Sequence, residues 1–371
     1  MPHELYALTT HQAGQWREVL DRIGAYDFHH LPAYHKLAEM RGEGEARLLV
    51  YRECDHLAAF PILVRPLPSL ITYHSSLITD VTSAHGYLGP LASVGIPDDA
   101  RQSFRDELQA YYESEGIVTA FTRLHPLFDQ SAMLEGYGEI AEIGVTVSID
   151  LTLPPHVQVA QYRKSNRYEI QRLKKMGYTC AEAGLERLDD FLRIYLETMH
   201  QLHADPYYFY DRAYFEYLFG DMADIMHLFV CMDGNTVACV GLFSNCNGII
   251  QYHLAGTASE YRRMAPMKLM LDTVREWGIA TGAKTFHLGG GVGAKRDSLY
   301  EFKMSFGGRE HSFHVWRHVA DQQLYDDLCA EACRRAGTRP DDSYFPIYRH
   351  PALQGGSIGE LPIPDRLPNA A

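Results

Sequence analysis

The chain has 371 residues, a formal net charge of −13, 46% hydrophobic residues and 22% charged residues. This composition is typical of a folded protein, and the length suits two domains of ordinary size. The acidic balance argues against a protein that coats DNA or RNA along its length. No apolar run reaches the roughly 18 residues of a membrane span, and the N-terminus lacks a signal-peptide pattern. We therefore expect a cytoplasmic protein with no membrane span and no DNA partner.

The spacing of the seven cysteines does not match a disulfide framework or a zinc site. None lies in a CxxC pair, and Cys329 and Cys333 have no histidines nearby at zinc-ligand spacing. The pattern favours free thiols in a reducing compartment over disulfides or structural zinc.

The first half of the chain predicts two helices followed by strands. The helices are Ala13–Ile23 and Pro32–Met40, and a β-hairpin over Arg47–Pro66 follows, with a polar turn between two apolar runs. After more strand come a helix at Asp98–Glu115 and a strand at Ile117–Arg123.

The second half repeats this order. Its helices are predicted at Leu188–Leu202 and Arg212–Met222, and its hairpin at His227–Ser244 turns at Asp233-Gly234-Asn235. A further strand, a helix at Met264–Thr281 and a strand at Lys284–Leu288 complete the second repeat. Two copies of one α/β unit are the economical interpretation.

The order helix, helix, hairpin, strand, helix, strand matches the GNAT type of acyltransferase fold. We therefore predict an α/β protein with two GNAT-like domains in tandem, each a mixed, mostly antiparallel sheet flanked by helices. The domains are expected at 1–153 and 154–320. A strand is predicted at His311–Val319, then a helix at Asp321–Ala336 and an extended tail. We treat 321–371, the C-terminal helix and tail, as a separate region.

Six segments in order carry a family resemblance. The first half contributes DVTSAHGYLGP (80–90) and FTRLHPL (121–127), and the second contributes RKSNRYEIQRLKKMGY (163–178), DPYYFYDRAYF (205–215), YHLAGT (252–257) and FHLGGG…DSLYEFKMSF (286–306). Together they resemble the FemABX family of aminoacyl-tRNA-dependent peptidyltransferases and their FemAB-like relatives, over roughly 13–319. The resemblance implies transfer of an amino acid from its tRNA ester to an amine.

One turn bears on the choice of cofactor. Acetyl-CoA-dependent GNAT proteins place a glycine-containing turn after the fourth strand, where backbone N–H groups hold the pyrophosphate. Here the sequence is Arg262-Arg263-Met264-Ala265-Pro266-Met267, without glycine and with a proline that lacks an N–H group. We therefore expect no coenzyme A and no other cofactor, with aminoacyl-tRNA as co-substrate.

The glycine run and the lysine after it form the first candidate site. In the family, the lysine that matches Lys303 is implicated in positioning the donor and stabilising negative charge, and an amine attacking an ester needs such a stabiliser. The alternative is a surface lysine on a helix whose core face is Phe302 and Phe306. Gly289, Gly290 and Gly291 either line the ligand or form a flexible turn, and Asp297 is expected to cap the helix.

A basic segment is the second candidate. Between Arg163 and Lys175 there are six basic residues and one acidic residue, and Arg163, Lys164, Arg167 and Tyr168 can project from one side of a helix. They either bind phosphate, from a tRNA acceptor end or a nucleotide-linked acceptor, or form a solvated basic face.

Tyrosines and histidines supply further candidates. Tyr207 and Tyr208 are either loop anchors or substrate contacts, and His253 and His287 are either core residues or groups near the reaction, with His253 the candidate general base. His200, His203 and Asp205 suggest a metal site only superficially, and we expect none.

The sequence thus predicts an enzyme, an acyltransferase that joins an amino acid from aminoacyl-tRNA to an amine. The acceptor would be a peptidoglycan precursor or a natural-product intermediate, such as a peptide, in cell-wall or antibiotic biosynthesis. An N-acyltransferase that uses acyl-CoA or an acyl carrier protein is the alternative, and a binding protein without catalysis is a second one. The amino acid, the acceptor, the base and the oligomeric state stay open.

Overall fold

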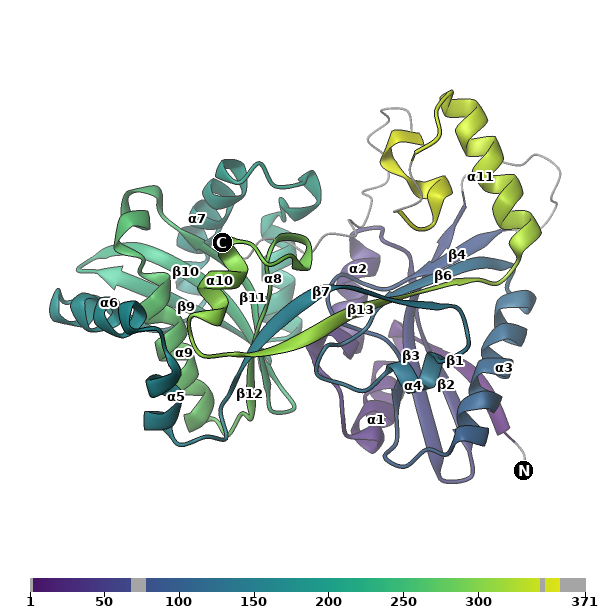
Figure 1. The fold of residues 1–371 in the computed structure, drawn as a ribbon, viewed down its shortest axis with the longest axis horizontal. Coiled ribbons are helices and arrows are strands. Elements are labelled where there is room, and N and C mark those ends of the chain that lie inside the picture. The colour runs from purple at the N-terminus through teal and green to yellow at the C-terminus, as the bar shows by residue number, and fades with distance from the viewer. Residues whose placement is uncertain (1–2, 68–77, 341–343, 354–371) are drawn as a thin grey trace. The chain divides into compact units, whose positions relative to one another are not determined.

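The structure is a computed structural model that describes residues 3–67, 78–340 and 344–353. These residues form two compact units, each described separately (Figure 1). The first unit contains the described residues of Met1–Ile143 together with those from Phe313 onward, and the second is Gly144–Ser312. No helix among the described residues has the length and apolar character needed to cross a membrane.

The first unit is built on one mixed sheet with the strand order β1-β2-β3-β4-β6-β13. Neighbouring strands are antiparallel except β4 and β6, which are parallel. The strands are β1 His3–Thr9, β2 Glu45–Glu53, β3 His56–Pro66, β4 Thr79–Thr82, β5 Leu91–Ala92 (beside β3) and β6 Ile117–Arg123. The helices are α1 Ala13–Ile23, α2 Pro32–Met40, α3 Asp98–Ser114, α4 Ser131–Leu134 and α11 Gln322–Ala336.

The second unit repeats this plan with the strand order β7-β12-β11-β10-β9-β8. Here too one neighbouring pair, β11 and β12, is parallel and the others are antiparallel. Its strands are β8 Thr179–Ala183, β9 Met226–Asp233, β10 Thr236–Cys246, β11 Ile249–Thr257 and β12 Thr285–Gly290. Its helices are α5 Pro155–Gln161, α6 Lys164–Lys175, α7 Leu188–Gln201, α8 Arg212–Asp221, α9 Met267–Ala280 and α10 Ser298–Met304.

Each unit is completed by a strand from the other half of the sequence. The strand β7 (Glu139–Asp150) follows the first repeat, yet its residues 146–150 pair with β12 in the second unit. The strand β13 (Arg309–Val319) follows the second repeat, yet its residues 315–319 pair with β6 in the first unit. The units therefore differ from the division expected at 153/154 and 320/321, because these strands belong to the sheets that they extend.

Apolar side chains from sheet and helices form a separate core in each unit. In the first, Phe60, Phe104 and the Trp316 of β13 are fully buried together. In the second, α9 packs on β8, β9 and β10, and its Met270 joins Phe243 and other residues of the sheet in a second core. The tandem α/β fold predicted from the sequence is therefore confirmed.

The ends of two predicted elements differ from expectation. The helix expected from Met264 begins at Met267, because Ser259–Met264 forms a 3₁₀ helix and Ala265 adopts a left-handed conformation before Pro266. The expected extended tail contains two 3₁₀ turns, Ile347–Arg349 and Pro351–Leu353, while its last part lies outside the described residues.

Candidate functional site

The candidate site lies where β11 and β12 stop pairing. Parallel pairing joins Ile249–Gln251 to Thr285–His287, but β11 continues to Thr257 and β12 to Gly290. The short helix α10 follows β12. Its N-terminus is capped by Asp297, which accepts a hydrogen bond of 2.9 Å from the Tyr300 N–H group, as expected from the sequence.

Lys303 lies where these two strands stop pairing. Its side chain is only 3% exposed, and Nζ donates a hydrogen bond of 2.6 Å to the Gly290 carbonyl of β12. The same nitrogen lies 5.6 Å from the ring centroid of Tyr252 on β11, within the range of a cation–π contact. Lys303 is therefore a buried group between β11 and the end of β12 and not a surface lysine.

Burial also changes the chemistry of Lys303. Because the charged ammonium is removed from water, its pKa falls to about 7, and the opposing influence of Asp297 is smaller. Charged and neutral forms of this side chain are thus both accessible near neutral pH.

The backbone of Gly289–Gly291 lies close to neighbouring atoms of the same unit. Gly289 has a φ of +74°, a conformation that favours glycine. A Cβ atom on Gly290 would lie 2.7 Å from the Val145 carbonyl oxygen, and one on Gly291 would lie 2.2 Å from Asp297 Oδ1. Glycine is therefore required at these positions for contacts within the protein, whatever ligand the loop contacts.

The basic helix α6 has the exposed face that its sequence suggested. Lys164, Arg167 and Tyr168 are exposed, and Tyr168 is 69% accessible despite its aromatic ring. Arg163, just before the helix, forms an ion pair of 2.5 Å with Glu301 on α10, and both side chains are more than half exposed. Such an exposed pair contributes little to stability.

Asn166, which the sequence analysis did not single out, ties α6 to α10. Its buried amide donates hydrogen bonds to the Ser305 hydroxyl (2.6 Å) and carbonyl (3.2 Å), and the Arg163 N–H group donates to the same carbonyl (2.8 Å). Because Ser305 directly follows α10, these bonds fix the helix that carries Lys303.

Comparisons with known proteins show which fold this chain shares. Residues 160–304 match the family model described as Acetyltransferase (GNAT) domain, which indicates an acyltransferase enzyme. The chain is also similar in structure to FemX, with a TM-score of 0.67 and 13% identity over 87% of this chain and 99% of that one. The chain has a FemX-like GNAT fold.

Two other solved structures share this FemX-like fold less closely. L-PGS from Bacillus licheniformis has a TM-score of 0.54 and 13% identity, over 86% of this chain and 95% of that one. The C-terminal domain of a putative lysylphosphatidylglycerol synthetase from Agrobacterium fabrum has a TM-score of 0.53 and 12% identity, over 86% and 94%. No curated protein sequence gives a significant match.

The tyrosine segment predicted from the sequence is buried. Tyr207 and Tyr208 lie in a 3₁₀ helix, Pro206–Tyr208, and the Tyr208 carbonyl accepts a hydrogen bond of 2.7 Å from the Tyr195 hydroxyl. The side chain of Asp205 caps this turn by accepting from the Tyr207 N–H group at 2.9 Å. These contacts show how the segment is anchored, while a role in substrate binding stays a prediction.

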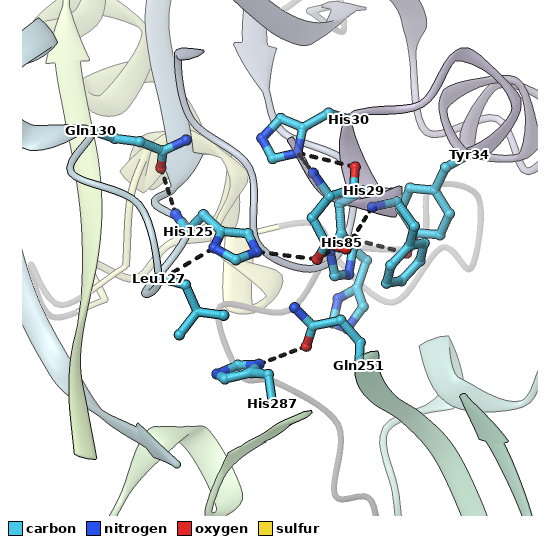
Figure 2. A network of polar contacts seen from close by, with 11 residues as sticks. His29, His30, Tyr34, His85, His125, Leu127, Gln130, Gln251 and His287 are labelled. Carbon is cyan, nitrogen blue, oxygen red and sulfur yellow. Dashed lines mark hydrogen bonds and ion pairs between the residues drawn. The ribbon is translucent and has the colours of Figure 1, made fainter. Parts of the chain in front are cut away.

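Of the two candidate histidines, His287 is buried and His253 is half-buried. His287 Nδ1 lies 2.6 Å from Oε1 of Gln251, its register partner on β11 (Figure 2). Because an amide oxygen only accepts, this bond places the proton of the neutral ring on Nδ1. His253 lies at a β-bulge of β11, where the register with β10 shifts.

The buried polar row around His287 extends across the sheet. Its register partner on β7 is Ser148, whose hydroxyl lies 2.7 Å from Nε2 of His311. Sequence spacing could not have revealed this row, because its residues come from distant segments. Among the described residues, no group of three or more histidines, cysteines or carboxylates is placed to hold a metal ion, and the ring of His200 packs on Phe209.

The first unit contains a buried histidine cluster that sequence analysis missed. Asp27 Oδ2 lies 3.1 Å from His125 Nε2 and 3.3 Å from His29 Nδ1, and the Asp27 N–H group donates to His30 Nδ1 at 3.2 Å. Figure 2 labels these three histidines. Burial alone would raise the pKa of Asp27. Hydrogen bonds from His125 and His29 outweigh the effect of burial and hold the pKa of this carboxyl well below its usual range.

Proposed function

We propose that the protein transfers an amino acid from aminoacyl-tRNA to an amine of a small acceptor and forms an amide bond. The acceptor is a peptidoglycan precursor or a peptide-like natural-product intermediate. This activity follows the FemABX resemblance of the sequence and the FemX-like fold. The ester of the donor supplies the driving force, so no nucleotide is hydrolysed.

The buried position of Lys303 is the observation that carries this proposal. Attack of an amine on the ester carbonyl develops negative charge on oxygen, and an ammonium group held in a buried site stabilises that charge strongly. Nζ is already oriented by the Gly290 carbonyl, so little reorganisation is needed. A pKa of about 7 keeps a substantial fraction of Lys303 charged at neutral pH.

The start of α9 supports a donor other than coenzyme A. The Lys268 and Leu269 N–H groups donate to the carbonyls of Ala265 (3.1 Å) and Pro266 (3.0 Å), and Pro266 itself has no N–H group. These two donors would have to leave their partners to bind a pyrophosphate. We therefore assign no cofactor to the protein.

The exposed face of α6 suits the phosphates of a tRNA acceptor end. It presents Lys164 and Arg167 beside the ring of Tyr168, which offers a surface for stacking a base. With about three phosphates neutralised, the logarithm of the affinity falls by only about 2 per tenfold rise in salt. A much steeper dependence contradicts this assignment of the face.

A transfer assay tests the proposal directly. The purified protein is incubated with candidate amines and total tRNA charged with labelled amino acids, with and without RNase, beside a parallel acetyl-CoA reaction. We expect label on the acceptor only without RNase. Label from acetyl-CoA alone would replace the proposal by an ordinary N-acyltransferase activity.

Variants of two lysines separate catalysis from folding in this assay. Lys303→Ala should reduce the rate by about 100-fold or more, the range for loss of one oxyanion stabiliser. Lys284→Ala, which removes an exposed lysine of the same unit, should keep the wild-type rate. Full activity of Lys303→Ala would contradict the assigned site.

A further inference from the structure

Three of the seven cysteines face one another across the strands at one end of the second sheet. Cys231 on β9 is the register partner of Cys180 on β8 and also of Cys239 on β10. Directly opposed residues of an antiparallel pair have Cα atoms about 4.5–5.5 Å apart, and disulfides span about 4.4–6.8 Å. Their spacing therefore matches that of bonded cysteines, although all three are free thiols here.

We propose that Cys180 and Cys231 form a reversible oxidation site that hydroperoxides convert to a disulfide. This site is distinct from the transfer chemistry proposed above and does not depend on it. Cys239 is the third thiol of the cluster and supports the reactive one.

The contacts of the three thiols favour Cys231 as the attacking thiolate of the disulfide-forming step. Hydrogen bonds from Cys180, and then from Cys239, lower the pKa of the Cys231 thiol to about 5. The same contact with Cys231 raises the pKa of Cys180, and burial raises that of Cys239. The thiolate is the nucleophilic form of cysteine, so Cys231 is the one poised to attack.

The position of the strands selects Cys180 as the partner. Cys231 and Cys239 are fully buried on inner strands, whereas Cys180 is half-buried on β8, a five-residue strand at the edge of the sheet. An edge strand can shift toward its neighbour more easily than a central strand. The bond between β8 and β9 therefore forms before one between β9 and β10.

The reaction is balanced in two steps. The half-buried Cys180 meets hydrogen peroxide first: its sulfur attacks one oxygen, breaks the O–O bond, releases water and becomes a sulfenic acid. The Cys231 thiolate then attacks that sulfur, forms the S–S bond and releases hydroxide, which takes up a proton to give the second water. In total the two thiols lose two electrons and two protons, and one peroxide becomes two waters.

Peptide mapping of the full-length protein tests this site. The reduced protein is treated with hydrogen peroxide, alkylated under denaturing conditions and digested. Cleavage after Lys175 and Arg187 releases a peptide in which Cys180 is the only cysteine, and a second cleavage at Asp233 separates Cys231 from Cys239. We expect a link between Cys180 and Cys231 that dithiothreitol removes.

Three variants make the result decisive. Cys180→Ser should lose the link, whereas Cys239→Ser should keep it. Cys54→Ser, which removes an exposed cysteine outside the cluster, should keep it too. The proposal is overturned if Cys180 and Cys231 both stay alkylatable while Cys54 is oxidised, or if the first bond joins Cys231 to Cys239 or Cys329 to Cys333.

Discussion

At the scale of single residues, the buried ammonium of Lys303 predicts how stability depends on pH. The unfolded chain holds this proton up to its ordinary pKa of 10.5, and the folded protein only up to about 7. Between these values the unfolded state binds more protons, so the contribution of Lys303 to stability rises with pH. Lys303→Met should therefore stabilise the protein at pH 7, and the gain should shrink by about 2 kcal/mol at pH 9.

Urea unfolding of Lys303→Met and wild type at the two pH values measures this difference. Lys284→Met is the matched control, because that lysine is exposed and should show no such trend. An equal effect of both substitutions would mean that Lys303 is hydrated in the folded protein.

His35 makes a prediction of the same sign, in the acid range. Its ring is fully buried, 5.1 Å from the ring of Trp16, and burial lowers its pKa from 6.5 to about 3. Below pH 6.5 the unfolded chain binds a proton that the folded protein does not, so stability is lost as pH falls. His35→Leu should reduce the loss between pH 7 and pH 5 by about 2 kcal/mol.

Thermal or urea unfolding at pH 7 and pH 5 checks the His35 prediction. His11→Leu, at an exposed histidine of the same unit, serves as the control. If wild type and His35→Leu lose stability in parallel, the acid sensitivity belongs to other groups.

The sequence indicated part of the site at this scale. Lys303 and Asp297, which caps the helix of Lys303, could be assigned to the site because they lie in one short segment after a glycine run. The buried state of Lys303, its bond to Gly290 and the pairing of His287 with Gln251 depend on strands brought together by folding. Spacing along the chain carries no information about such contacts.

At the scale of elements, Asn166 links α6 to the helix that carries Lys303. Asn166→Ala removes two hydrogen bonds to Ser305 but leaves the bond from the Arg163 N–H group. We expect a loss of about 1–3 kcal/mol in the free energy of unfolding, because the buried Ser305 hydroxyl loses a partner. Hydrogen exchange at 298–306 should accelerate.

The exposed neighbour Ser165 provides the control for this link. Ser165→Ala should leave both stability and exchange in α10 unchanged. Unaltered exchange in Asn166→Ala would show that the remaining contacts, including the bond from the Arg163 N–H group, hold α10 without Asn166.

Local sequence pattern was sufficient for most helices and for both hairpins. The helices α1 and α2 have the predicted ends, and the second hairpin turns at Gly234, where φ is +55°. It was not sufficient for β7, whose partner β12 lies more than 130 residues further along the chain. Pairing across such distances is decided by tertiary packing.

At the scale of the whole molecule, the exchanged strands predict where the chain can be divided. A fragment of residues 144–312 keeps the part of β7 that pairs with β12, whereas a fragment of 154–320 lacks it and exposes β12 as an edge. We expect the first fragment to unfold cooperatively on heating and the second to aggregate. Circular dichroism and light scattering during heating compare the two fragments. Identical unfolding of both would contradict the claim that the second unit needs β7 to fold.

The exchange of β7 and β13 also has a consequence for synthesis on the ribosome. The first unit cannot bury Trp316 until residues beyond 300 have left the exit tunnel, although its other strands were made much earlier. Domains usually finish folding in the order of their synthesis, the N-terminal one first. Among the described residues, the last strand to be translated is β13, and it completes the first unit, so the first sheet stays unfinished until the second unit has been made.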